Sequence, residues 1–200
     1  MDAKQKKKAA ALFKLHKQLL LTINVLDADI AFAAKQWRQD TANQFWARTN
    51  IRCFCASIEG VLSMLKNVTP DTAKYFDVHL SEKEIELATE RRRHNKNGII
   101  KEVRISSPLP ERIKETFKLF LKAHDTDIPI EYNAAEFNDL RDGFELRNKL
   151  MHPKGVFDLQ VSSQAMESAI RGQRWFSAVL IAVLEKCAEK QPFSTLGLNS

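Results

Sequence analysis

Glycine and proline, which interrupt helices, and cysteine, which forms disulfides, are scarce in this sequence. Its 200 residues include only 6 Gly, 6 Pro and 3 Cys, while Ala, Leu, Lys and Glu are abundant, a balance that predicts an all-α protein. Cys53, Cys55 and Cys187 are too few and too widely placed for a disulfide framework or a zinc site. We therefore expect reduced cysteines in a helical core.

Long apolar runs are also missing. Thr22, Asn24, Asp27 and Asp29 interrupt the longest candidate, so no segment reaches the ~20 apolar residues that cross a bilayer. The Lys-rich start followed by leucines imitates a signal peptide, but the same polar residues and the lack of a small-residue cleavage site argue against one. The sequence predicts no membrane segment and a cytoplasmic protein.

Several signatures of enzyme classes are absent. The sequence has no P-loop, no Gly-rich dinucleotide turn and no nucleophile elbow. It has no His-x-x-x-His pair and no carboxylate cluster of a two-metal type. We expect neither a cofactor nor a metal. The net charge of +6 and a pI near 9.2 permit RNA as a partner without indicating it.

Hydrophobic periodicity predicts a bundle of five or six helices. With 44% hydrophobic residues the chain can form one domain over residues 1–190, with an insertion at approximately 71–132 and a mobile tail at 191–200. Two short segments, 99–105 and 128–132, are expected to pair as a small ribbon. The expected helices are 4–38 (one long helix, or two with a break), 43–66 (ending before Pro70), 81–94, 110–123, 133–152 and 162–187.

Capping residues mark several of these starts. Ser81 followed by Glu84 is a capping box. We expect Asn43, or else Thr41 or Asp40, to cap the second helix, Asn133 to cap the fifth, and Ser162 or Ser163 to cap the last.

One helix face carries an arginine among apolar residues. Steps of three and four pass through Phe137, Leu140, Phe144, Arg147 and Met151. Arginine is rarely buried without a partner, so an anionic group should meet Arg147.

The same helix should end at His152. This residue precedes Pro153, and a residue before proline is driven out of the α region. Five helical steps separate Arg147 from His152, which places them about 140° apart, whereas Asn148 and His152 share a face. An arginine and histidine site therefore needs a distorted last turn or a second chain.

The pattern Arg147-Asn148, three further residues and His152 resembles the HEPN superfamily, whose signature is Arg-x(4–6)-His. The resemblance covers residues 134–187 well and implies a helical bundle, in many members a metal-independent endoribonuclease with sites composed across a homodimer. Such proteins act as toxins, in antiviral defence or in RNA processing, while others have lost activity and bind nucleotides or partners. An antitoxin or a nucleotidyltransferase is the kind of partner that the resemblance implies.

These residue types suit RNA cleavage. The RNA 2′-hydroxyl attacks the neighbouring phosphodiester when a base takes its proton and a cation stabilises the charge on phosphorus. An imidazole serves as general base or acid, and a guanidinium meets phosphate oxygens. The predicted catalytic residues are thus His152, Arg147 and Asn148, the last to orient the imidazole or bind phosphate.

Other cations are candidate RNA contacts. The densest basic run comprises Arg91, Arg92, Arg93 and Lys96; its simpler interpretation is favourable electrostatics at a helix C-terminus. Arg48 and Arg52 form a second pair at i,i+4, with surface solvation as the simpler interpretation.

A structural alternative accounts for the central motif without catalysis. Arg147 would pair with a carboxylate such as Asp142, Glu59 or Glu136, and His152 would only end a helix. The chain would then be a helical binding or dimerisation module for a nucleotide, RNA or partner protein.

Overall fold

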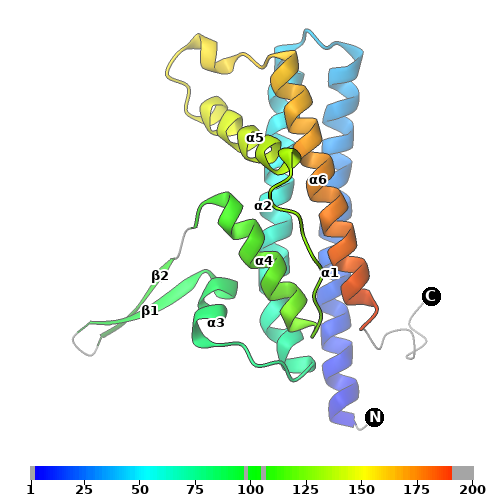
Figure 1. Ribbon diagram of the computed structural model, residues 1–200, viewed down its shortest axis with the longest axis vertical. Coiled ribbons are helices and arrows are strands. Elements are labelled where there is room, and N and C mark those ends of the chain that lie inside the picture. The colour runs from blue at the N-terminus through cyan, green and yellow to red at the C-terminus, as the bar shows by residue number, and fades with distance from the viewer. Residues whose placement is uncertain (1–2, 97–98, 105–106, 191–200) are drawn as a thin grey trace. The chain divides into compact units, whose positions relative to one another are not determined.

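The structure, a computed structural model, describes residues 3–96, 99–104 and 107–190, with side chains described for 5–91 and 107–190. Within these ranges the predicted all-α helical bundle is confirmed (Figure 1). The described residues form six α-helices, one 3-10 helix (η1) and one two-stranded ribbon. The elements are α1 (Ala3–Gln39), α2 (Gln44–Tyr75), α3 (Glu82–Thr89), β1 (Arg91–Lys96), β2 (Ile99–Arg104), α4 (Leu109–Ala123), α5 (Ala135–Met151), η1 (Val156–Leu159) and α6 (Ser163–Ala188).

The chain divides into two compact units. Unit 1 comprises residues 1–19, 62–128 and 183–200, and unit 2 comprises residues 20–61 and 129–182. The long helices α1, α2 and α6 each contribute residues to both units. The single domain expected over residues 1–190 stays a prediction. In the described part of the chain, no helix combines the length and apolar character that a membrane crossing needs.

Unit 1 is built around α4. The residues predicted to face inward from this helix, Ile113, Phe117, Phe120 and Leu121, are all buried, because they recur at helical spacing on one side. The buried residues of unit 1 also include Leu12 of α1, Leu62 and Leu65 of α2 and Val183 of α6.

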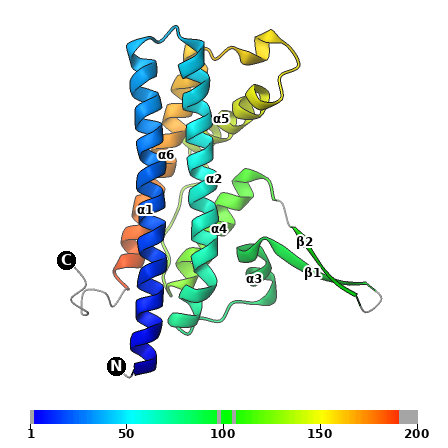
Figure 2. The ribbon, with the colours of Figure 1, turned by 180° about the vertical axis from the view of Figure 1, so that it is seen from behind.

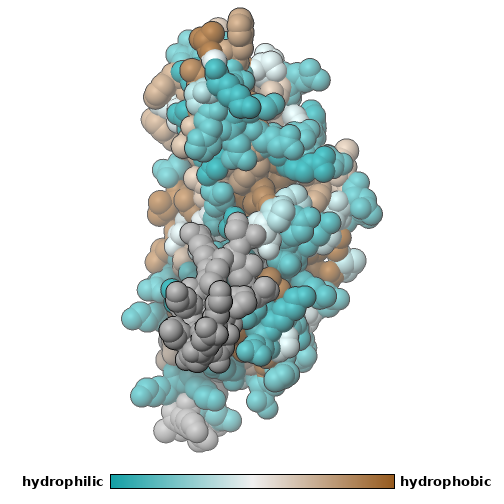
Figure 3. Space-filling model, turned by 90° about the vertical axis from the view of Figure 1, so that its left-hand side faces the viewer, coloured by the Kyte–Doolittle hydropathy of each residue, from teal (hydrophilic) through white to brown (hydrophobic). Residues whose placement is uncertain are grey.

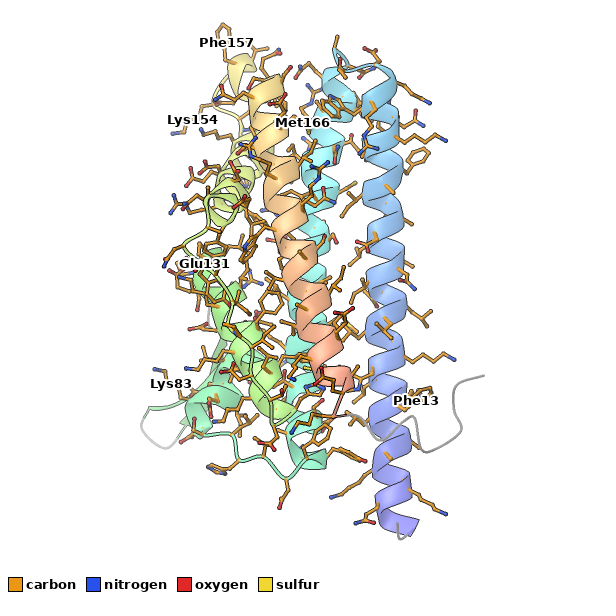
Figure 4. The ribbon with its side chains drawn as sticks, turned by 45° about the vertical axis from the view of Figure 1, so that its right-hand side comes forward. Phe13, Lys83, Glu131, Lys154, Phe157 and Met166 are labelled. Atoms are coloured by element: carbon orange, nitrogen blue, oxygen red, sulfur yellow. The ribbon has the colours of Figure 1, made fainter. Side chains whose placement is uncertain are left out.

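Unit 2 is built around the contact of α5 with α2 and α6. Phe54 on α2 meets Phe144 on α5 edge to face, with ring centroids 6.2 Å apart. Met166 on α6 is 1% exposed (Figure 4). Gly172 on α6 lies against the backbone of α5, because a Cβ at this position would lie 2.5 Å from the Leu140 backbone. This glycine permits the close crossing that holds α5 in place.

Three predicted helix starts are confirmed. Ser81 and Glu84 form both bonds of the capping box at α3. The Asn43 Oδ1 accepts the N–H groups of Phe45 and Trp46 at α2. The Ser162 hydroxyl accepts the N–H of Ala165 at α6. The Asn133 prediction is wrong, because α5 starts after Ala134 without a side-chain cap and the Asn133 N–H bonds to Glu131 instead.

The predicted stop of α2 at Pro70 is also wrong, since the helix continues to Tyr75. A proline inside a helix costs ~3 kcal/mol through its missing N–H and its ring clash. Buried residues beyond it offset this cost: Thr72 and Ala73 are at most 2% exposed. The Thr72 hydroxyl also donates to the Val68 carbonyl at 2.8 Å. Tertiary burial therefore outweighs the local preference of proline.

The segment after α3 is a strand instead of the predicted helix end. The helix stops at Thr89, and Glu90 takes a left-handed conformation with φ 52°. β1 then pairs antiparallel with β2, from Arg91 opposite Arg104 to Lys96 opposite Ile99. Figures 1 and 2 show this ribbon running out beside α3 and away from α4.

The predicted pairing of 99–105 with 128–132 is therefore wrong for the described residues of the first segment. A partner two residues away costs less loop-closure entropy than one further along the chain. The Asn97-Gly98 dipeptide, the strongest short hairpin signal, stands between the two strands in the sequence. These two residues themselves lie outside the described part, as does the tail predicted at 191–200.

Candidate functional site

Arg147 lies in unit 2 on the α5 face that packs towards α2. Its Nη2 donates to the Glu59 Oε2 at 2.9 Å, and its Nη1 donates to the Asn148 Oδ1 at 3.1 Å. The anion required for an arginine in an apolar stripe is thus Glu59, one of the three carboxylates anticipated by the structural alternative. The pair is only partly buried, with side chains 30% and 34% exposed.

His152 ends α5, as the following proline predicts. Its φ of −132° and ψ of 58° are not helical, and its N–H donates to the Asn148 carbonyl at 3.0 Å. The side chains of His152 and Asn148 are both exposed. The last turn of α5 therefore presents an imidazole and an amide to solvent beside a guanidinium.

The three predicted catalytic residues are linked pairwise through Asn148. Its side chain accepts from Arg147 and its backbone carbonyl accepts from His152. Among the hydrogen bonds described for residues 135–159, none joins the His152 ring to the Arg147 guanidinium. The amide of Asn148 is thus placed to orient the arginine, a role that the sequence did not indicate.

A buried thiol lies close to the ion pair. Cys55 is 0% exposed, and its Sγ lies 3.8 Å from the Gly143 carbonyl oxygen. Burial raises the pKa of Cys55 to about 12, with a smaller lowering by Arg147 and a smaller raising by Glu59. A thiol held neutral in this way is no nucleophile.

Arg48 and Arg52, predicted as RNA contacts, donate to backbone carbonyls. The Arg48 Nη1 donates to the Leu159 carbonyl at 3.1 Å, and the Arg52 Nη2 donates to the Leu150 carbonyl at 3.3 Å. They tie η1 and the end of α5 to α2. Both are positioned as supports of the candidate site; their contact with RNA stays a prediction.

The segment from Met151 to Phe157 carries exposed apolar groups and an exposed lysine, and of these the sequence pointed only to Met151, on the stripe with Arg147. Met151 is 50% exposed, Val156 67% and Phe157 87%, and Lys154 is exposed. In Figure 4 the side chains of Lys154 and Phe157 both point away from α6. The face drawn in Figure 3 is mostly hydrophilic, with separate hydrophobic patches.

The basic run lies on β1 instead of a helix C-terminus, so the macrodipole explanation for it is wrong. Arg91 is exposed, while the side chains of Arg92, Arg93 and Lys96 lie outside the described residues. Their contact with phosphate stays a prediction.

Unit 1 holds a second polar cluster that the sequence did not predict. The Lys66 side chain is 6% exposed, and its Nζ lies 3.1 Å from the Glu90 Oε1. The Arg112 Nη2 lies 3.6 Å from the same oxygen. Lys66 also lines a cavity of 640 Å³ with Arg91, Glu82 and Glu86. Two cations and two carboxylates line this cavity, so its lining carries no excess of either charge. Among the described residues, no group of three or more His, Cys, Asp or Glu is arranged to hold a metal.

No protein-family model, no curated protein and no solved structure matches this chain. The resemblance of residues 134–187 to the HEPN superfamily therefore stays a prediction.

Proposed function

We propose that this protein is a metal-independent endoribonuclease of the HEPN type that acts as a homodimer. The observation that carries the proposal is the last turn of α5, where three side chains suited to phosphodiester cleavage are open to solvent. Arg147 keeps 30% of its side chain exposed, and Asn148 and His152 are exposed.

In this proposal His152 moves protons and Arg147 stabilises charge. The imidazole takes the proton of the RNA 2′-hydroxyl or returns one to the leaving 5′-oxygen, a contribution of typically 10²–10⁴-fold. The product ends would be a 2′,3′-cyclic phosphate and a free 5′-hydroxyl. DNA would be inert because it lacks the 2′-hydroxyl.

The guanidinium retains capacity for a phosphate. Arginine carries more N–H donors than the bonds to Glu59 and Asn148 use in the described part of the chain. Asn148 holds the fork through its Oδ1, and its amide nitrogen can donate to a phosphate oxygen. Glu59 is the competitor that an incoming phosphate would meet.

In this proposal a second copy of the chain supplies the histidine that would face Arg147 of the first copy. Within one chain Arg147 turns towards α2 while His152 stands at the exposed end of α5. Two-fold symmetry would bring the two exposed histidines and arginines to one cleft. The exposed Met151 beside the motif gives such an interface an apolar contact.

A second function is favoured by the Arg147–Glu59 ion pair itself. If that pair only stabilises the packing of α5 on α2, the protein is a helical binding or dimerisation module. RNA, a nucleotide or a partner protein would then bind without being cleaved.

Labelled RNA incubated with the protein in excess chelator separates the two functions. We expect cyclic-phosphate ends with the wild type, a loss on the order of 10²–10⁴-fold in His152→Ala, and incomplete activity in Arg147→Lys because the ammonium lacks the fork. The matched DNA strand is the control. Cleavage abolished by chelator, or retained by both His152→Ala and Arg147→Ala, would leave the binding module.

A further inference from the structure

The η1 turn presents a phenylalanine almost wholly to solvent. Phe157 is 87% exposed and its neighbour Val156 is 67% exposed. In Figure 4 Phe157 points outward from the turn. An aromatic side chain in this position forgoes most of the stabilisation that burial would give.

Hydrogen bonds fix the turn that carries this ring. The Asp158 carboxylate accepts the Lys154 N–H at 2.8 Å, and the Gln160 N–H donates to the Phe157 carbonyl at 3.1 Å. From α2, Arg48 donates to the Leu159 carbonyl at 3.1 Å. The turn is thus tied both to itself and to a long helix.

A second tie follows directly after η1. The Gln44 side chain donates to the Val161 carbonyl at 3.2 Å and accepts the Val161 N–H at 2.8 Å. Val161 itself is 6% exposed. Because the segment is held by hydrogen bonds at Leu159 and Val161, local unfolding does not account for the exposure of Phe157. The outward position of the ring belongs to the folded structure.

The ring lies within reach of the candidate site. Five residue steps separate His152 from Phe157, which limits their Cα separation to about 18 Å at ~3.6 Å per step. Lys149 and Lys154 are exposed on either side of His152 in the sequence. Cations next to an exposed aromatic face are the combination that single-stranded nucleic acid uses, because its bases stack while its phosphates pair.

We propose that Phe157 is a stacking platform for an unpaired base of the RNA, close to the phosphodiester at His152. This inference rests on the proposed function and names its substrate class as single-stranded or looped RNA. An apolar protein partner is less suited to the site, because the sequence around Phe157 mixes the charged Lys154 and Asp158 with the exposed Val156, unlike a contiguous apolar patch.

Binding of single-stranded RNA that carries a fluorescent base analogue tests the platform. In a His152→Ala background, which keeps the RNA intact, we expect the analogue to be quenched on binding. Phe157→Ala should remove the quenching and weaken binding about 5- to 150-fold, the range for loss of one stacked base. Phe157→Trp should retain both signals, since an indole also stacks.

Phe32→Ala is the matched control. This phenylalanine on α1 is 58% exposed in the same unit, and its loss should leave RNA affinity unchanged. Equal affinity in Phe157→Ala and its parent, or no RNA binding by the parent, would overturn the platform. So would a dimer that dissociates on Phe157→Ala in sedimentation, which would assign the ring to a protein contact.

The two proposals fail separately. Cleavage that is indifferent to Phe157→Ala removes the platform and leaves the nuclease. Phe157-dependent stacking by a protein whose wild type never cleaves RNA removes the nuclease and leaves an RNA-binding platform.

Discussion

Glu59 holds the guanidinium that the proposed reaction needs. At an ion pair whose side chains are 30% and 34% exposed, the interaction contributes only about 0–1 kcal/mol to stability. A phosphate that displaces Glu59 from Arg147 therefore costs the protein only this small ion-pair stabilisation.

We expect Glu59→Gln to raise RNA affinity by releasing Arg147, with a small loss of stability. Fluorescence anisotropy with labelled RNA measures the first and urea unfolding the second. Glu145→Gln, an exposed carboxylate two residues before Arg147, controls for the change in net charge. Equal gains in both variants would show a general electrostatic effect and no competition at the guanidinium.

Two buried histidines in unit 1 make stability depend on pH. His16 is 7% exposed and His124 is 0% exposed, with ring centroids 5.4 Å apart. Burial, with a smaller effect of His124, lowers the pKa of His16 to about 4. Burial also lowers the pKa of His124, although its Nδ1 contact with the Phe120 carbonyl opposes this shift.

A base whose folded pKa is depressed binds its proton more readily when unfolded. The contribution of neutral His16 to the free energy of unfolding is therefore fully present above the unfolded pKa near 6.5. It is lost as pH falls from there towards the folded pKa of about 4. Urea unfolding at pH 7 and pH 5 should show part of the loss, which for His16 is roughly 3–4 kcal/mol over the full range from pH 6.5 to 4. His16→Leu should reduce this dependence; an unchanged slope would place the titrating groups elsewhere.

At the scale of elements, the crossing of α5 and α6 depends on the absence of one side chain. A Cβ on Gly172 would meet the Leu140 N and Cα at 2.5 Å, and neither backbone atom can rotate away. Gly172→Ala should therefore destabilise the protein by roughly 1–3 kcal/mol or more.

Gly155→Ala is the control for this substitution. No atom lies within 4 Å of its ideal Cβ, and its φ of −169° suits any residue. Urea midpoints of the two variants make the comparison. A Gly172→Ala midpoint equal to that of Gly155→Ala would contradict the close crossing.

Elements with their own periodicity were predictable, and those decided by distant contacts were not. The inward face of α4 follows from helical spacing, and the end of α5 follows from Pro153. Local rules failed at Pro70, where burial carries α2 past a helix breaker. They failed again at Arg91, where basic residues that suit a helix end form a strand.

The candidate site divides in the same way. The need of Arg147 for an anion was readable, because arginine interrupts an apolar stripe. Which of the three anticipated carboxylates meets Arg147 was not readable, because Glu59 lies 88 positions away in the sequence and leaves no local signal. The ties from Gln44 and Arg48 to the segment after α5 were equally hidden.

At the scale of the whole molecule, a composite site predicts complementation. Arg147→Ala and His152→Ala are each expected to be inactive. In a mixed dimer one of the two sites would regain an intact arginine from one copy and an intact histidine from the other. After subunit exchange, an equimolar mixture should recover about one quarter of wild-type activity, since half of the dimers are mixed.

RNA cleavage by the mixture compared with each variant alone measures the recovery, and sedimentation shows whether a dimer exists. A double variant mixed with wild type is the control for exchange. No recovery despite demonstrated exchange would contradict a site that takes one arginine and one histidine from different copies.

The buried thiol of Cys55, whose pKa is influenced by the charges of Arg147 and Glu59, can report local opening of the protein through its reactivity. A thiol that is 0% exposed and whose pKa is about 12 reacts with a thiol reagent only when the surrounding packing separates. Cys53 is half-buried and should react first, while Cys187 is buried, so a Cys187→Ser variant leaves Cys55 as the slowly reacting thiol. The modification rate of Cys55 then measures how often the packing around this residue opens. An RNA bound across α5 and α2 would slow this modification.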